Sequence, residues 1–315
     1  MKYCFGIDIG GTTVKIGLFD IEGKVVDKWE IVTRKENSGE NILPDIAKAV
    51  SEKLEEKHID KADVFGIGTG IPAPINAEGI VNGSANLGWG YKEVKKELEE
   101  LTGFRVCTGN DANVAALGEM WQGSGNGAKN MVMVTLGTGV GGGIIVDGKI
   151  LAGEHGAGGE IGHFCVDYDE TEACGCGNKG CLEQYASATG IVRLAKRKLA
   201  NESRDTKLNS FENITAKDVF DSVKEDDEVA KEVADEFGDY LGAGLSTLCA
   251  VIDPSVIVVG GGVSKAGEIL LDYIKNGFAK RCFFANKNVE FKLASLGNDA
   301  GIYGSAKMIM DTLED

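Results

Sequence analysis

The chain has 315 residues, of which 43% are hydrophobic and 26% charged, a composition ordinary for a globular protein of about two domains. Its formal net charge of −16 argues against nucleic acid as a partner, and no apolar run is long enough to predict a membrane span. Glycine is in excess, since 45 residues are about twice the usual share. The glycines therefore indicate tight turns and close backbone approaches.

A strand–turn–strand pattern opens the chain and recurs later. Residues 8–20 read DIGGTTVKIGLFD, and residues 135–147 read TLGTGVGGGIIVD. Each has an apolar strand, a turn of glycine and threonine, a second apolar strand and a final aspartate. Because the first strand begins at once, we expect no signal peptide. With eight cysteines, that implies reduced thiols and a cytoplasmic protein.

Both turns can expose consecutive backbone N–H groups, which bind anions. We expect them to hold the phosphates of ATP through Gly10, Gly11, Thr12 and Thr13 in the first turn and Gly137, Thr138 and Gly139 in the second. Asp8, at the end of the first strand, is assigned to Mg²⁺ through water, because an acid beside a phosphate needs a cation between them. Glycine-rich hairpins without a ligand are the alternative.

Two other glycine motifs in the second segment are accidental in their context. Gly137, Gly139 and Gly142 satisfy G-x-G-x-x-G, but a dinucleotide fold needs a helix next, whereas residues 144–148 predict a strand and a hairpin turn. Residues 143–149 resemble a phosphate-binding loop until Ile150 replaces the required Ser or Thr. We expect neither fold.

Strands and helices alternate in the rest of the chain. We expect strands at 64–68, 105–108, 256–259 and 289–293, and helices at 42–57, 91–101, 112–121, 190–200, 229–250, after 262 and at 302–313. This order is typical of parallel sheets flanked by helices, an α/β fold. The repeat predicts two lobes with a cleft between them, residues 1–115 and 116–299, joined near 110–125. The closing segment 300–315 could return to the first lobe.

A metal site is indicated between residues 163 and 183. Cys174, Cys176 and Cys181 lie within the run CGCGNKGC, and His163, one of only three histidines, precedes them. Three thiols and one imidazole suit tetrahedral Zn²⁺ with no open position, so the ion would be structural. Unliganded cysteines in a glycine-rich loop are the alternative.

A third glycine cluster, Gly260, Gly261 and Gly262, follows a β-branched strand and precedes a helix. Backbone without side chains would let an adenine or a ribose lie flat against it, which adds these residues to the expected ATP site. Tight packing also explains three glycines.

Five motifs together carry a family resemblance that covers nearly the whole chain. They are DIGGTTVKIGLFD, GNDAN, LGTGVGGG, GEHGAGGEIGH and CGCGNKGCLE. The sequence resembles the ROK family of bacterial sugar kinases and repressors, and within it the glucokinases. The resemblance implies a two-lobed fold of the actin/hexokinase type (a duplicated ribonuclease H-like fold) and ATP with Mg²⁺ as donor. It also implies a hexose acceptor, glucose foremost, and a homodimer or homotetramer.

The resemblance also assigns residues to the reaction. Asp111 of GNDAN matches the catalytic base, and Asn110 matches a ligand of a sugar hydroxyl. A carboxylate at the lobe junction can accept the proton of the attacking hydroxyl and hold it in line with the γ-phosphate. Both residues also precede a helix, where Asn and Asp are good N-caps, so capping alone is the alternative.

Three more residues, Glu160, His163 and Glu183, match family positions that hydrogen-bond the sugar. His163 would serve twice, with one ring nitrogen on zinc and the other toward the sugar, so the zinc loop would organise the sugar pocket. Asn86, in the segment NGSANLGWG, is the residue expected from the first lobe. Residues 71–74 read IPAP where the family commonly has a glycine between the prolines, a departure that does not exclude glucose. For the glutamates, a surface position is the alternative.

Several rival functions are weighed against these residues. A sugar-sensing repressor of the same family would carry a helix-turn-helix domain in front, which we do not expect here. A noncatalytic sugar-binding module would not need Asp111 and both turns. Kinases for mannose, fructose, N-acetylmannosamine or N-acetylglucosamine are closer alternatives that the sequence discriminates poorly. Polyphosphate is the alternative donor, but the third glycine cluster and the lack of basic patches favour ATP.

Overall fold

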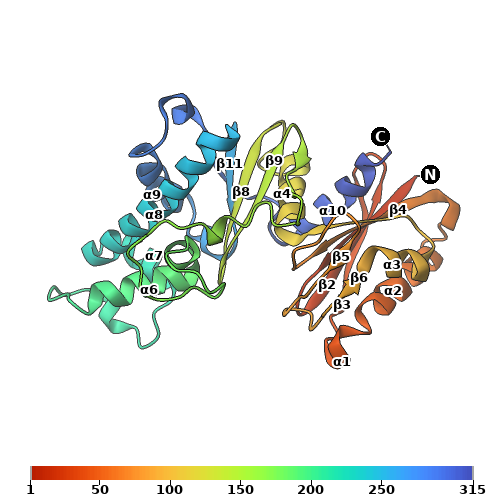
Figure 1. The fold of residues 1–315 in the computed structure, drawn as a ribbon, viewed down its shortest axis with the longest axis horizontal. Coiled ribbons are helices and arrows are strands. Elements are labelled where there is room, and N and C mark those ends of the chain that lie inside the picture. The colour runs from red at the N-terminus through yellow and green to blue at the C-terminus, as the bar shows by residue number, and fades with distance from the viewer. Residues whose placement is uncertain (1, 314–315) are drawn as a thin grey trace. The chain divides into compact units, whose positions relative to one another are not determined.

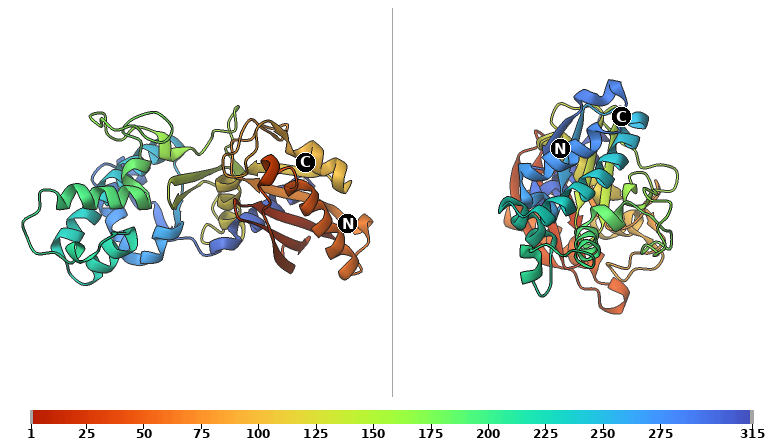
Figure 2. Two further views of the ribbon diagram at one scale, coloured as in Figure 1. Left: turned by 90° about the horizontal axis from the view of Figure 1, so that it is seen from below. Right: turned by 90° about the vertical axis from the view of Figure 1, so that its left-hand side faces the viewer.

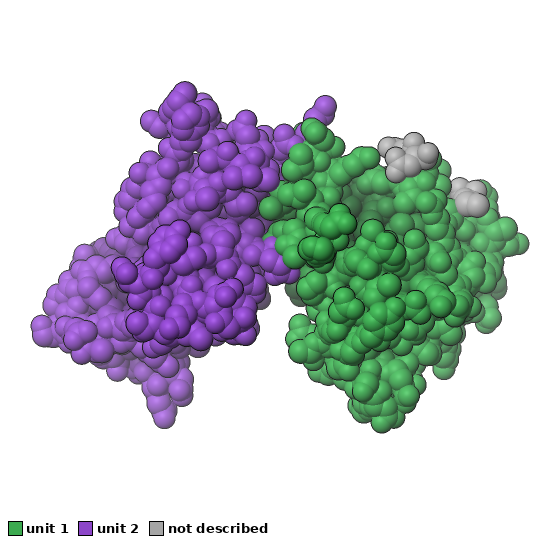
Figure 3. All heavy atoms as spheres, in the orientation of Figure 1, with its two compact units in different colours: residues 1–127, 143–159, 296–315 green, residues 128–142, 160–295 purple. Residues whose placement is uncertain are grey.

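The computed structural model describes residues 2–313, and the chain forms an α/β protein with two compact units. Unit 1 comprises residues 1–127, 143–159 and 296–315, and unit 2 comprises residues 128–142 and 160–295 (Figure 3). The predicted α/β class is confirmed. The predicted boundary at 115/116 falls inside helix α4 (Asp111–Gln122), all of which belongs to unit 1.

The first sheet has five strands in the order β3-β2-β1-β4-β7 (Figure 1). They are β1 (Tyr3–Ile9), β2 (Thr13–Asp20), β3 (Val25–Val32), β4 (Val64–Ile71) and β7 (Val106–Asn110). The first three are antiparallel neighbours, which confirms the first predicted hairpin, whereas β4 and β7 continue the sheet in parallel. Every residue of β4 is buried, as expected for a parallel strand covered on both faces.

Unit 1 also contains helices and short strands: α1 (Glu36–Gly39), α2 (Ile42–Glu56), β5 (Ile80–Val81), β6 (Lys92–Glu93), α3 (Val94–Thr102), α4 and α10 (Ala300–Asp311). The apolar face of α2, with Ile46 and Val50, joins the core beneath the sheet. On β1 and β4, a Cβ at Gly6 or Gly68 would collide with the backbone of α10. These glycines therefore let the last helix pack directly on the sheet.

A second five-stranded sheet has the order β10-β9-β8-β11-β12. Its strands are β8 (Met131–Leu136), β9 (Val140–Val146), β10 (Lys149–Ile150), β11 (Val256–Gly260) and β12 (Glu290–Leu293). The strands β8, β11 and β12 are parallel. A hairpin turn at Asp147 and Gly148 joins β9 to β10. A strand and not a helix thus follows the second glycine turn, which confirms that the dinucleotide motif is accidental.

The helices of unit 2 are α5 (Glu183–Ala186), α6 (Ala188–Leu199), α7 (Ala216–Lys224), α8 (Glu228–Ile252) and α9 (Glu268–Ala279). The long α8 contacts α6, α7 and α9. Figure 2 shows these helices in green to blue. The helices predicted at 190–200 and 229–250 are confirmed. Within residues 2–313, none of the helices combines the length and apolarity that crossing a bilayer requires.

Candidate active site

In unit 1, the carboxyl ends of three neighbouring strands bring predicted residues together. The register pairs Asp8 of β1 with Gly70 of β4, and Gly70 with Gly109 of β7. Asp8 and the Asn110–Asp111 pair therefore lie at the same edge of the sheet, where open α/β sheets bind their ligands. The Cα of Asp111 is 3.6 Å from the place where a Cβ on Gly70 would stand.

Asp8 is a partly buried carboxylate beneath the first turn of α10. A Cβ on Gly301 would stand only 2.5 Å from Asp8 Cγ. Burial raises the pKa of Asp8 above its usual value, while Lys15, its register partner on β2, acts in the opposite direction. A cation beside Asp8 would offset the cost of burying its charge, so this carboxylate fits the predicted Mg²⁺ role.

The first glycine turn joins β1 to β2 and contacts the predicted sugar loop. Gly10 N–H donates to Thr13 O over 3.0 Å, and Thr33 Oγ1 donates to Gly10 O over 2.7 Å. The backbone oxygen of Asn86 is 3.2 Å from where a Cβ on Gly11 would stand. The structure therefore places Asn86 directly against the turn that was expected to hold phosphate.

At the start of α4, Asn110 and Asp111 take different roles. Asn110 is the N-cap, because its Oδ1 accepts from the N–H groups of Ala112 at 3.0 Å and Asn113 at 3.2 Å. Its Nδ2 donates to the carbonyl of Ala73 at 3.3 Å, and the same amide has a second hydrogen that it can donate to another acceptor. Asp111 lies in the first helical turn, where the helix dipole favours a carboxylate.

Asn113, which the sequence analysis did not single out, supports this region. It is 2% exposed, and its Nδ2 donates to Gly158 O over 3.0 Å. The bond ties α4 to the loop that precedes Glu160. The sequence feature that could have identified Asn113 is its position as the second Asn of GNDAN, three residues after the N-cap Asn110.

In unit 2, the second and third glycine clusters meet at the carboxyl edge of β8 and β11. The register pairs Gly260 with Thr135, so both strands end side by side. Gly261 has a φ of 85°, and a Cβ on it would stand 2.5 Å from the backbone of Leu136. Packing thus accounts for Gly261. A Cβ on Gly262 would meet open space, so packing does not account for that glycine.

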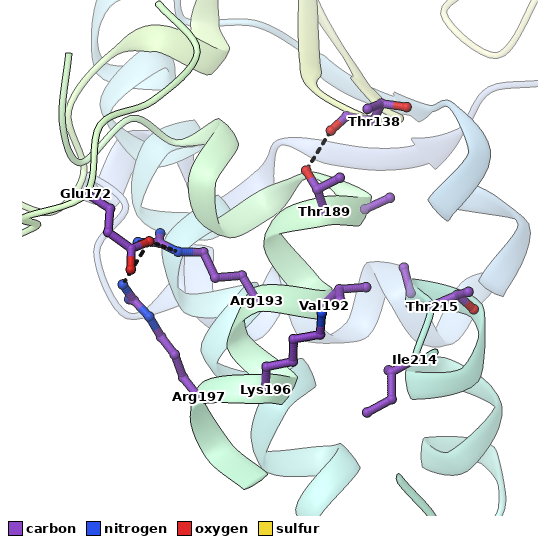
Figure 4. Close-up of a pocket in the computed structure, with 11 residues that line it drawn as sticks. Thr138, Glu172, Thr189, Val192, Arg193, Lys196, Arg197, Ile214 and Thr215 are labelled. Carbon is purple, nitrogen blue, oxygen red and sulfur yellow. Dashed lines mark hydrogen bonds and ion pairs between the residues drawn. The ribbon is translucent and has the colours of Figure 1, made fainter. Parts of the chain in front are cut away.

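A pocket of about 600 Å³ adjoins the second turn, and Thr138 belongs to its lining (Figure 4). Thr189, Val192 and Lys196 line it from α6, and Ile214 and Thr215 line it from the segment that leads into α7. Thr189 Oγ1 donates to Thr138 O over 2.8 Å. A mostly apolar wall with a few polar groups is typical of a site for a flat organic ring.

This pocket was not predicted, because α7 was not among the predicted helices. The signal was present, since Thr215 and Asp218 form a capping box that marks the start of that helix.

The four predicted zinc ligands converge in the structure. Their ligand atoms all lie within 4.8 Å of one another, with Cys176 Sγ 3.7 Å from Cys181 Sγ and Cys174 Sγ 3.9 Å from His163 Nδ1. Tetrahedral Zn²⁺ with bonds of about 2.3 Å to sulfur separates its sulfur ligands by about 3.8 Å. The cluster therefore fits this ion, and Nε2 of His163 remains on the other side of the ring.

A buried ion pair fastens the zinc loop to α6. Glu170 accepts from Arg193 Nη2 at 2.7 Å and from the Tyr185 hydroxyl at 2.6 Å. Burial opposes ionisation of Glu170, but the hydrogen bonds from Tyr185 and Arg193 hold its pKa well below the usual range. Arg193 and Arg197 also pair with Glu172, and all three residues belong to the lining of the pocket (Figure 4).

The two predicted glutamate ligands of the sugar lie at opposite ends of the zinc loop. Glu160 is exposed and directly precedes the 3₁₀ turn Ile161–His163, whose last N–H donates to Glu160 O. Glu183 begins α5, and its Oε1 is 3.7 Å from Cys174 Sγ. Its other oxygen, Oε2, accepts from Val140 N–H in the second glycine turn over 3.0 Å.

Known proteins similar to this chain agree with these features. Residues 4–312 match the model of the ROK family. The chain is 43% identical to the glucokinase of Halalkalibacterium halodurans, over 98% of this chain and 95% of that protein. A ROK family glucokinase from Streptomyces griseus, solved with glucose and AMPPNP, matches with a TM-score of 0.74 and 33% identity over 97% of this chain and 98% of that one.

The ROK hexokinase of Thermus thermophilus matches with a TM-score of 0.83 and 29% identity, covering 99% of this chain and all of that one. These similarities confirm the predicted actin/hexokinase type of fold. The chain belongs to the ROK family.

Proposed function

We propose that this chain is an ATP-dependent hexose kinase that converts glucose to glucose 6-phosphate. The observation that carries the proposal is that the assigned residues lie at the carboxyl ends of neighbouring strands in each sheet. Asp8 and Asp111 share one edge of the first sheet, and the glycine clusters at 137–139 and 260–262 share one edge of the second. The 43% identity to a glucokinase over nearly the whole chain supports glucose as the acceptor.

In the proposed reaction, Asp111 accepts the proton of a primary sugar hydroxyl. The hydroxyl oxygen then bonds to the γ-phosphorus of ATP, the bond from that phosphorus to the β–γ bridging oxygen breaks, and ADP leaves. Backbone N–H groups of the turns at 10–13 and 137–139 stabilise the charge on the transferred group. Asp8 would hold Mg²⁺ through water, and the ion would neutralise part of the charge of the phosphates.

The remaining assignments concern the sugar and the base. The sugar is hydrogen-bonded by Asn86, Asn110, Glu160, His163 and Glu183. The pocket beside Thr138 receives the base of the nucleotide, because it adjoins a turn that binds phosphate and offers the apolar wall that a purine requires. His163 and the three cysteines would hold Zn²⁺, whose role would be structural.

We also infer a cytoplasmic homodimer or homotetramer. The family resemblance implies the oligomer. The eight cysteines, all within the described residues and none in a disulfide there, agree with a reducing compartment.

A coupled assay of ADP release over a panel of hexoses tests the function. We expect the highest kcat/KM with glucose, and lower values with mannose, fructose and the two N-acetylated sugars. Asp111→Asn should reduce kcat by about 10²- to 10⁴-fold, because the general base is lost. Preference for another sugar contradicts the substrate, and an unimpaired variant contradicts the base. An arm with polyphosphate in place of ATP tests the donor.

A further inference from the structure

The carboxylate of Glu183 is bonded to the second glycine turn. Its Oε2 accepts from Val140 N–H at 3.0 Å, and a Cβ on Gly139 would collide with the same oxygen. The absence of a side chain at residue 139 is therefore what allows Glu183 to reach the turn. At Gly137 the situation differs, because the nearest atom to an added Cβ is Gly139 O, at 4.0 Å.

Two further hydrogen bonds tie the same turn to the chain that follows Glu183. Ala188 N–H donates to Gly137 O, and Thr189 Oγ1 donates to Thr138 O, both over 2.8 Å. Ser187 Oγ, one residue before, donates to Glu183 O over 2.7 Å. Residues 183–189 and the turn at 137–140 therefore form one hydrogen-bonded block, and a displacement of Glu183 must disturb the turn.

We infer that Glu183 couples the sugar site to the phosphate-binding turn, an inference that rests on the proposed function. Without sugar, the carboxylate occupies Val140 N–H and places a negative charge beside the turn that binds phosphate, and like charges repel. Sugar hydroxyls that donate to Glu183 take up part of its charge and so weaken this repulsion. Sugar thus raises the affinity for nucleotide, and by linkage nucleotide raises the affinity for sugar by the same factor.

The first test changes the turn and measures sugar binding in the absence of nucleotide. Glucose binding is measured by calorimetry for the wild type, Gly139→Ala and Gly137→Ala. We expect Gly139→Ala to weaken binding at least about tenfold, because its methyl displaces Glu183, and Gly137→Ala to stay within about twofold of the wild type. Equal affinities in wild type and Gly139→Ala overturn the inference. Far-UV circular dichroism and thermal unfolding show whether each variant folds.

The second test alters the glutamate and reads out the nucleotide, with no sugar present. Glu183→Gln keeps the shape but removes the charge, so a nonhydrolysable ATP analogue should bind several-fold more tightly than to the wild type. Glu160→Gln changes the other predicted sugar glutamate, which the structure does not bond to the turn, and should leave this affinity within about twofold. Equal binding to Glu183→Gln and the wild type overturns the coupling, even where Gly139→Ala does not fold.

The two proposals fail in different ways. A wild-type protein that neither binds nor phosphorylates any hexose contradicts the proposed function. The sugar-free nucleotide measurements still decide whether Glu183 acts on the turn.

Discussion

At the scale of one residue, the ionised form of Asp8 lowers the stability of the fold but is the form that the proposed reaction needs. The carboxylate stands at the end of β1 under the first turn of α10, and burial raises its pKa. The folded state therefore disfavours the ionised form, which is the form that Mg²⁺ requires. This cost is absent at acid pH, below the unfolded-state pKa of about 4, and grows as the pH rises through the raised folded-state pKa.

Replacing Asp8 by Asn should therefore stabilise the nucleotide-free protein at neutral pH while abolishing activity with Mg-ATP. We expect a melting temperature higher by a few degrees at about pH 8, and a difference that vanishes toward about pH 4. Thermal unfolding of both proteins across this range measures the effect. The exposed Asp205→Asn serves as the control, with an unchanged melting temperature. A lower melting temperature for Asp8→Asn at pH 8 contradicts the prediction.

At the scale of elements, α5 depends on its surroundings. A helix of four residues, Glu183–Ala186, has no stability of its own. It follows Cys181 by two residues, and the side chain of Tyr185 is fixed by Glu170 and Asp167. The zinc loop therefore sets the position of Glu183, whereas the turns at 137–139 and 260–262 stand at the carboxyl ends of strands β8 and β11.

Removal of zinc should consequently harm sugar binding more than nucleotide binding. Protein purified without added metal should contain about one zinc per chain, and a chelator that strips it should weaken glucose binding by at least about tenfold. Elemental analysis and calorimetry give the two values. Cys176→Ser should lose the metal, while Cys165→Ser, an exposed cysteine of the same loop outside the cluster, should keep it. Full zinc content in Cys176→Ser contradicts the site.

Local patterns predicted most elements but few of the contacts between them. The long apolar repeat of α8 and the β-branched residues of β11 were sufficient to predict these two elements, because each signal lies within one continuous segment. The short, more polar α7 was missed, and with it the pocket beside Thr138. The bond from Val140 to Glu183 joins residues 43 positions apart, and no local pattern encodes such a contact. The family motifs identified Glu183 as a predicted sugar ligand, but they did not indicate its hydrogen bond with Val140 in the second glycine turn.

At the scale of the whole molecule, neither unit is formed by one continuous stretch of the sequence. Unit 1 is assembled from three separate stretches of sequence, and its last stretch contains α10. That helix contacts β1, β2, β4, β7 and α4. The first stretch of unit 1 therefore does not bury its own core, because α10 from the last stretch must pack on its sheet.

The oligomeric state is the prediction that belongs to this scale. Light scattering on the eluting protein should give two or four times the chain mass of 33.3 kDa. The value should hold on dilution to about the concentrations used in enzyme assays, because an obligate interface is large. A mass of one chain throughout contradicts the homodimer and the homotetramer alike.

The return of α10 to the first sheet has a consequence for biosynthesis. The strands β4 and β1 leave the ribosome roughly 230 and roughly 290 residues, respectively, before the helix that covers them. At about 5 to 20 residues per second, the nascent chain spends roughly 10 to 60 seconds with that apolar face exposed. Such an exposed apolar face is a target for chaperones, and Asp8 gains its neighbours in α10 only after that helix has been synthesised.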